Sequence, residues 1–271
     1  MTDLAVVGRT AGGLAYDAAG SGSPIVLVHA GIADRRMWDP QWPAFASIGR
    51  VVRYDARGYG ETLPPAGPWS HHADLLALID ELGLGRAHLV GTSMGAGIAV
   101  EAALARPRAV ASLLLVAPGG ALLGDGADSL RQVWHEEVEA LDRGDLDAAV
   151  EVNLRAWVDG PTRNADAVDP EVRALVGRMQ RDAFELPDWD PEANPEHELS
   201  PAAADRLREI RCATYVLVGD LDQPATKDAA KRIATEVEGA RLEVWPDVAH
   251  VPTLERPADF EQLAVTFLAG R

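Results

Sequence analysis

Short, mainly apolar blocks separated by glycines dominate the first part of the 271-residue chain. Such blocks predict β-strands, because β-branched side chains pack well on a pleated surface and glycine allows a turn after each block. The predicted strands cover residues 4–7, 14–17, 24–29 and 50–55. The last two have the apolar character expected of strands that are covered on both faces of a largely parallel sheet.

Beyond residue 55 the apolar positions alternate between helical spacing and strand spacing. Helices are predicted at residues 70–82 and 94–106, the second stopped by Pro107, and strands at 87–90 and 112–117. Strands and helices that alternate in compact units favour right-handed crossovers. The sequence therefore predicts an α/β fold with a doubly wound, mostly parallel sheet.

This alternation is interrupted in the middle of the chain. Helices without clear strands are predicted at residues 129–141, 146–158 and 171–184, followed by a proline-rich connecting arm at 187–201. Strands at 213–218 and 241–245 and helices at 226–237 and 257–268 then restore the α/β pattern. We therefore expect a core built from residues 1–118 and 205–271, with residues 119–204 inserted as a helical unit.

Charge and cysteine content narrow the range of partners. The net charge is −17, of which residues 119–204 carry −13 from 20 acidic and 7 basic residues. Such a chain repels phosphate backbones and anionic membranes, so neither nucleic acid nor a membrane is expected as a partner. A single cysteine, Cys212, allows no intramolecular disulfide, and no segment has the pattern of a signal peptide or a membrane span. A cytoplasmic location is the resulting expectation.

Residues 89–97, LVGTSMGAG, contain the pattern G-x-S-x-G between a predicted strand and a predicted helix. In that context the pattern indicates a sharp turn that exposes a nucleophilic serine, here Ser93. The N–H of Met94 then lies at the helix N-terminus, where it can stabilise an oxyanion formed on Ser93.

A serine hydroxyl is a weak nucleophile and needs a base that a third group keeps oriented. Catalytic groups collect beyond the carboxyl ends of the strands of a doubly wound sheet, so the loops after residues 218 and 245 are the places to search. These loops contain His250 as the candidate base, and Asp220, Asp222 and Asp247 as candidate carboxylates.

Several of these segments together resemble the α/β-hydrolase fold family, of the compact bacterial kind with a helical cap. The resemblance covers nearly the whole chain. It is carried by His29-Ala30-Gly31, Asp55-Ala56-Arg57-Gly58-Tyr59-Gly60, the turn at Ser93, Gly219-Asp220-Leu221-Asp222 and His250.

The resemblance implies Ser93 as nucleophile, His250 as base and then acid, and Asp222 as the orienting carboxylate, with Asp220 and then Asp247 as rivals. It also implies that the loop after the third predicted strand, residues 24–29, supplies a second oxyanion amide. Because His29-Ala30-Gly31 replaces the usual His-Gly-x, that amide is expected at Gly31, with Ile32 as the alternative.

Other residues receive structural interpretations. The resemblance implies a hydrogen-bonding role for His29, and residues 55–60 are interpreted as a loop held by an ion pair. No ligand spacing typical of a metal site is present, and no cofactor is implied. Trp134, Trp157 and Trp189 are candidates for the roof of a substrate pocket, and Trp38 and Trp42 could border it.

The expected function is cleavage of a small carboxylic ester or lactone through an acyl-enzyme, with a small molecule as substrate. Alternatives on the same three residues are an amidase or iminopeptidase, a carbon–carbon bond hydrolase and a perhydrolase. A small-molecule receptor without turnover is an alternative of another class. The exact substrate and the oligomeric state are left open by the sequence.

Overall fold

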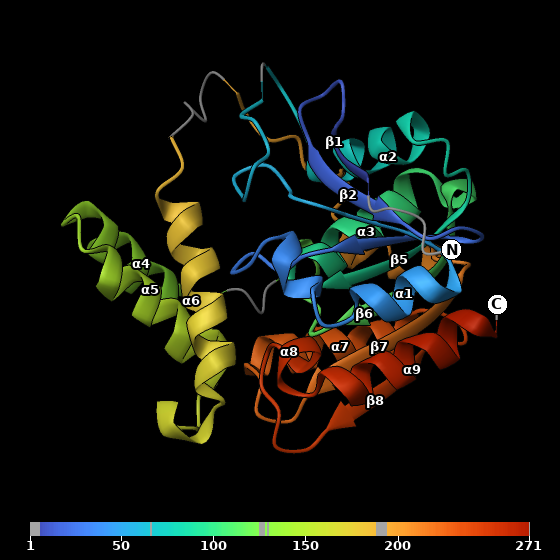
Figure 1. Cartoon of the computed structure of the whole chain (residues 1–271). Helices are drawn as coiled ribbons and strands as arrows, with labels where there is room; N and C mark the ends of the chain where they lie inside the picture. The colour runs from blue at the N-terminus through green and yellow to red at the C-terminus, as the bar shows by residue number, and fades with distance from the viewer. Residues whose placement is uncertain (1–5, 66, 125–127, 129, 188–193, 271) are drawn as a thin grey trace.

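A computed structural model describes residues 6–65, 67–124, 128, 130–187 and 194–270 of the chain. Eight strands form one sheet in the order β1-β2-β4-β3-β5-β6-β7-β8 (Figure 1). Strand β2 runs antiparallel to both of its neighbours, and the other pairs are parallel. The strands are β1 Val6–Arg9, β2 Ala15–Ala19, β3 Pro24–Val28, β4 Arg50–Tyr54, β5 Ala87–Thr92, β6 Val110–Val116, β7 Ala213–Gly219 and β8 Arg241–Trp245. The predicted α/β fold with a mostly parallel sheet is confirmed.

Helices cover both faces of this sheet, because alternate residues of the central strands point in opposite directions. Val26 and Val28 pack with helices α2 (His71–Glu81), α3 (Met94–Ala105) and α7 (Pro224–Glu236). Ile25 and Leu27 pack on the opposite face with α1 (Trp42–Ile48) and α9 (Pro257–Ala269), which lie side by side in Figure 1. Between β8 and α9 the chain forms the short helix α8 (Pro252–Glu255). The central strands are therefore buried between two helical layers.

Between β6 and β7, the described residues form three longer helices. They are α4 (Arg131–Asp142), α5 (Leu146–Asn153) and α6 (Pro170–Phe184), which we call the insert helices. Figure 1 shows them to one side of the sheet, next to the loops around α8. The helix predicted at 146–158 changes after Asn153 into a π-helical turn, Leu154–Asp159. The proposed boundaries at residues 119 and 204 remain a prediction.

Several short elements were not predicted, and parts of others lie outside the described residues. Helix α1 and the 3₁₀ turn Arg35–Trp38 fall in a segment without helical apolar spacing. Residues 4 and 5 of the first predicted strand, residue 129 of the first insert helix and residues 188–193 of the arm lie outside the described residues.

The two tryptophans near this 3₁₀ turn differ from the sequence-based suggestion that they border the pocket. Trp38 is fully buried and packs against Phe260 of α9, with ring centroids 6.2 Å apart. Trp42 lies beneath the guanidinium of Arg53, 4.5 Å from its ring centroid. Neither side chain lines the cavity at Ser93.

Candidate active site

Ser93 occupies the turn between β5 and α3 in a strained backbone conformation. Its φ of 55° and ψ of −117° are rarely adopted by a residue with a side chain. Two glycines permit this turn. A Cβ at Gly91 would lie 2.3 Å from the carbonyl oxygen of Gly95, and a Cβ at Gly95 would lie 2.3 Å from that of Val28. The G-x-S-x-G pattern thus reflects close approach of the helix to two strands.

The structure brings Ser93, His250 and Asp222 together. The Oγ of Ser93 lies 2.7 Å from Nε2 of His250, and Nδ1 of His250 lies 2.9 Å from both carboxylate oxygens of Asp222. With Nδ1–H donating to the carboxylate, Nε2 is left to accept from the serine hydroxyl. His250 is 2% exposed and Asp222 1% exposed, so water competes little for these hydrogen bonds.

Asp222 differs from its rivals Asp220 and Asp247 in burial and in hydrogen-bond partners. The carboxylate of Asp222 accepts a further hydrogen bond from the N–H of Gln223, at 2.6 Å, and points at His250. Asp220 is exposed, and its carboxylate accepts from the N–H of Asp247 at 2.9 Å, which is also exposed. Asp220 and Asp247 therefore serve to join the two loops.

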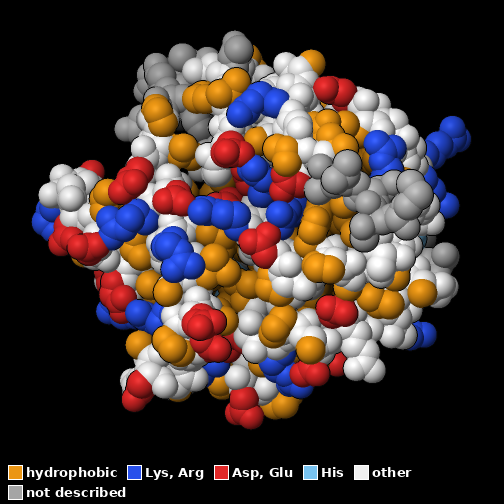
Figure 2. Space-filling view, in the orientation of Figure 1, with side chains coloured by type: hydrophobic (Ala, Val, Ile, Leu, Met, Phe, Trp, Pro, Cys, Tyr) orange, Lys and Arg blue, Asp and Glu red, His pale blue; other side chains and the backbone are white. Residues whose placement is uncertain are grey.

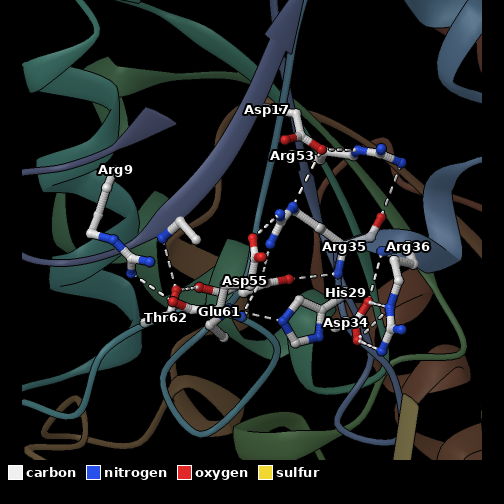
Figure 3. A network of polar contacts seen from close by, with 12 residues as sticks. Arg9, Asp17, His29, Asp34, Arg35, Arg36, Arg53, Asp55, Glu61 and Thr62 are labelled. Carbon is white, nitrogen blue, oxygen red and sulfur yellow. Dashed lines mark hydrogen bonds and ion pairs between the residues drawn. The ribbon is translucent and has the colours of Figure 1, made fainter. Parts of the chain in front are cut away.

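His29 and Asp55 fix the loop that leads to Gly31. Nε2 of buried His29 accepts from the N–H of Ala56 at 2.8 Å, and its Nδ1–H donates to the carbonyl of Ala30 at 2.8 Å. The side chain of Asp55 accepts from the N–H of Arg35 at 2.9 Å and forms an ion pair with its guanidinium (Figure 3). The hydrogen-bonding role predicted for His29 agrees with this geometry.

The ion pair predicted within residues 55–60 is instead two separate pairs. Asp55 pairs with Arg35, which also contacts Asp17, whereas Arg57 pairs with Asp74 of α2 at 2.6 Å. The carboxylate and the guanidinium lie two residues apart in sequence, but they face different elements. Spacing alone gave no indication of these partners.

A cavity of about 240 Å³ opens at Ser93. Its lining comes from both the sheet side and the insert helices: Gly31, Ile32, Tyr59, Ser93, Trp134, Glu137, Asn153, Trp157, Gln180, Phe184 and His250. A Cβ added to Gly31 would lie 3.6 Å from the Met94 side chain. The two residues that are proposed to supply the oxyanion amides are therefore close in space, although they are far apart in the sequence. Gly31 and Ile32 both line the cavity, and the choice between their amides remains a prediction.

A second, larger groove of about 650 Å³ lies between β8 and α9. None of the predicted site residues lines it. Among the described residues, no cluster of three or more His, Cys, Asp or Glu side chains is arranged to hold a metal ion. Within the same described ranges, every helix is too short or too polar to cross a membrane.

Comparison with known proteins identifies the family of this chain. The model of the alpha/beta hydrolase family matches residues 25–263, which include the segments of Ser93, Asp222 and His250. The chain belongs to the alpha/beta hydrolase family.

Relatives of this alpha/beta hydrolase differ in the reactions for which they are named. The chain is 39% identical over 266 residues to the candidate non-heme bromoperoxidase BpoC of Mycobacterium tuberculosis, covering 95% of this chain and 98% of that protein. It is 26% identical over 267 residues to 2-hydroxy-6-oxo-6-phenylhexa-2,4-dienoate hydrolase of Comamonas testosteroni, covering 94% and 91%. Its fold matches Est816, described as an N-acyl homoserine lactone degrading enzyme, with a TM-score of 0.73, 27% identity and coverage of 94% and 96%.

The insert of this alpha/beta hydrolase contacts the histidine directly. The π-helical turn places the Trp157 ring 4.6 Å from the ring of His250, and the Trp157 carbonyl accepts from the N–H of His250 at 3.2 Å. Gln223, next to Asp222, donates to the carbonyl of Ala156 at 2.7 Å. A π-helical turn is frequent at functional sites, and here it attaches the insert to both loops of the site.

The sequence-based interpretation missed five of the eleven residues that line the cavity of this alpha/beta hydrolase. Trp134 and Trp157 line the cavity as suggested, and Trp189 lies outside the described residues. Glu137, one helical turn after Trp134, was not singled out, although a spacing of three places both residues on one face of α4. That spacing was the available signal. Tyr59, Asn153, Gln180 and Phe184 gave none.

Proposed function

We propose that this chain is a serine hydrolase that cleaves a small carboxylic ester or lactone through an acyl-enzyme intermediate. The observation that carries the proposal is the hydrogen-bonded series from Ser93 through His250 to Asp222, at a cavity of about 240 Å³. This is the arrangement that a serine needs to become a nucleophile, namely a base within hydrogen-bond distance and a carboxylate that orients the base.

In the proposed mechanism, Oγ of Ser93 attacks the substrate carbonyl while Nε2 of His250 takes its proton. Asp222 keeps Nδ1–H of His250 directed away from the serine and stabilises the imidazolium that forms. The amides of Met94 and Gly31 donate to the oxyanion. His250 then protonates the leaving oxygen, and water repeats the sequence on the acyl group with His250 as base.

The cavity favours a small substrate that does not carry a carboxylate. Its volume of about 240 Å³ lies below the usual range for drug-sized ligands, roughly 300–1,000 Å³. Its described lining includes Glu137 and no lysine or arginine. Dienoates, the carboxylates for which one relative is named, would meet a like charge at Glu137 without a cation to offset it. Esters and lactones therefore rank above carbon–carbon cleavage of such anions.

A perhydrolase is the second candidate, because the chain is 39% identical to BpoC, a relative that is named as a bromoperoxidase. A perhydrolase uses hydrogen peroxide in place of water as the acceptor of the acyl group from Ser93. Bond making and bond breaking at Ser93 and His250 would otherwise be unchanged, so the two candidates differ only in the second half of the cycle.

The nucleophile is tested by fluorophosphonate labelling of the wild type, Ser93→Ala and, as a control, Ser23→Ala at an exposed serine. We expect Ser93→Ala to abolish both labelling and turnover of p-nitrophenyl esters, and Ser23→Ala to retain both. Labelling or turnover that persists without Ser93 contradicts the proposal.

A substrate panel then distinguishes the reaction classes. Esters, lactones and arylamides are compared in water and with added hydrogen peroxide, while product release is monitored by mass spectrometry. Arylamide cleavage above ester cleavage would indicate an amidase, and peracid formation would indicate a perhydrolase. Stoichiometric binding without product release would indicate a receptor.

A further inference from the structure

We propose that Glu137 binds a protonated amine carried by the substrate, and that this contact determines which substrates reach Ser93. The inference rests on the proposed function and names its substrate class, an ester or lactone that carries an ammonium group. Glu137 lies on α4, in the wall of the cavity that Ser93 and His250 also line.

Asn153 holds the Glu137 carboxylate without neutralising it. The side-chain amide of Asn153 donates to Oε2 of Glu137, and its Nδ2 also donates to the carbonyl of Ala149 at 3.1 Å. Asn153 is buried and carries no charge, so it orients the carboxylate but leaves its negative charge in place.

The carboxylate has no counter-charge in the cavity. Of the described residues that line it, none is a lysine or arginine, and the ring of His250 is engaged by Ser93 and Asp222. Burial raises the pKa of Glu137, and the hydrogen bond from Asn153 offsets this only in part. A cation that enters the cavity would stabilise the ionised carboxylate and return its pKa towards the ordinary range.

Several other acids of the insert form salt bridges with arginines. Asp159 forms a salt bridge with Arg173 at 2.9 Å, and Arg173 also binds Glu151 at 2.7 Å. On the face shown in Figure 2, acidic and basic side chains are mixed over the insert helices. Against this background the position of Glu137, next to the nucleophile and held by a neutral amide, differs from that of the paired acids.

Aromatic side chains complete a binding site for a cation. Tyr59, Trp134, Trp157 and Phe184 line the same cavity as Glu137. Aromatic rings attract ammonium groups through their electron-rich faces, whereas they give a neutral hydroxyl no comparable attraction. A carboxylate among four aromatic side chains therefore favours an ammonium group over a neutral alcohol as the ligand.

The test uses two pairs of substrates that differ only in charge. The first pair is 2-(dimethylamino)ethyl butanoate and its carbon isostere 3-methylbutyl butanoate, with the cation on the alcohol side. The second pair is alanine ethyl ester and ethyl 2-methylpropanoate, with the cation on the acyl side. Values of kcat/KM are measured at a pH where the amines are protonated, for the wild type, Glu137→Gln and Glu139→Gln. Glu139 is an exposed acid on the same helix, so its variant matches the change in charge outside the cavity.

We expect the wild type to prefer the ammonium member of at least one pair by about tenfold or more. In Glu137→Gln that ratio should fall towards one, and in Glu139→Gln it should be retained. Ratios near one for both pairs in the wild type overturn the proposal, and this result needs no variant that could misfold. A ratio unchanged in Glu137→Gln, or reduced equally in Glu139→Gln, also overturns it.

Binding without turnover separates this proposal from the proposed function. The Ser93→Ala protein, with and without Glu137→Gln, is titrated with isopentylammonium and with isopentyl alcohol by calorimetry. We expect the ammonium ion to bind more tightly than the alcohol only while Glu137 is present. If esters are not hydrolysed but this difference is found, the hydrolase assignment fails and the role of Glu137 stands. If esters are hydrolysed and the difference is missing, the role of Glu137 fails alone.

Discussion

Among individual residues, the two acids of the loop after β7, Asp220 and Asp222, make different contacts. Asp222 is buried and accepts from His250, whereas Asp220 is exposed and accepts from the N–H of Asp247. Because an amide in place of the Asp222 carboxylate can leave His250 in the wrong tautomer, Asp222→Asn should lower kcat for an activated ester by about 10³ to 10⁴-fold. Asp220→Asn keeps an oxygen acceptor for the N–H of Asp247 and should change kcat by less than about threefold. Equal losses would contradict the assignment of Asp222.

The residues that the sequence could predict are those whose position depends on backbone topology. Ser93, Asp222 and His250 follow strands, so the parallel sheet alone brings their loops to one edge. Glu137 and Asn153 depend on how α4 and α5 pack above that edge, which no local pattern specifies. The positions of these three side chains were therefore predictable, and those of Glu137 and Asn153 were not.

Among the helices and strands, α3 carries a buried acid, Glu101. Glu101 is 7% exposed. Burial, and then the charges of Glu196 and Glu198, raise its pKa to about 7, although the N–H of Leu199 donates to it. The ordinary pKa is 4.5, so the folded state holds this proton more tightly than the unfolded state. The resulting stability is fully present below pH 4.5 and is lost as the pH rises through 7.

Glu101→Gln should therefore become more stable than the wild type as the pH increases. We expect the two proteins to have similar free energies of unfolding near pH 4.5 and the variant to gain on the order of 2 kcal/mol by pH 8. Urea denaturation at a series of pH values measures this difference. Glu238→Gln at an exposed position is the control and should show no such trend. A difference that is independent of pH would refute the assignment.

The elements themselves were predictable where one repeat pattern persisted. Strands β3 and β6 alternate between two buried layers, and their apolar runs identified them. Helix α1 was missed because its seven residues, Trp42–Ile48, are too short for a helical repeat to show. The π-helical turn after Asn153 has the composition of an ordinary helix, so only its contacts with the site reveal it.

In the molecule as a whole, Arg163 connects the insert to the loop that carries His250. Its guanidinium donates to the carbonyls of Val158 and Asp159 in the insert and to that of Asp247 beyond β8. It also pairs at 2.6 Å with Glu255, whose carboxylate accepts from the N–H of Ala249. Both side chains of the pair are largely buried.

Arg163→Met should therefore weaken both stability and activity. Loss of the arginine leaves the buried carboxylate of Glu255 unpaired, which costs about 3 kcal/mol or more in the free energy of unfolding. We also expect a lower kcat, because the loop that carries His250 loses its support. Chemical denaturation and ester turnover measure the two effects. Arg178→Met, at an exposed position of α6, carries the same change in charge and should alter stability by less than about 0.5 kcal/mol.

The hydrogen bond from the main-chain N–H of His250 to the carbonyl of Trp157 limits how this hydrolase can be engineered. Exchange of the insert for that of a relative is an obvious route to a new substrate range. A transplanted segment would bring its own cavity wall, but it would also have to present a main-chain oxygen to His250. Grafts that exchange only segments of the insert before or after the π-helical turn Leu154–Asp159, and keep the turn itself, leave that oxygen in place.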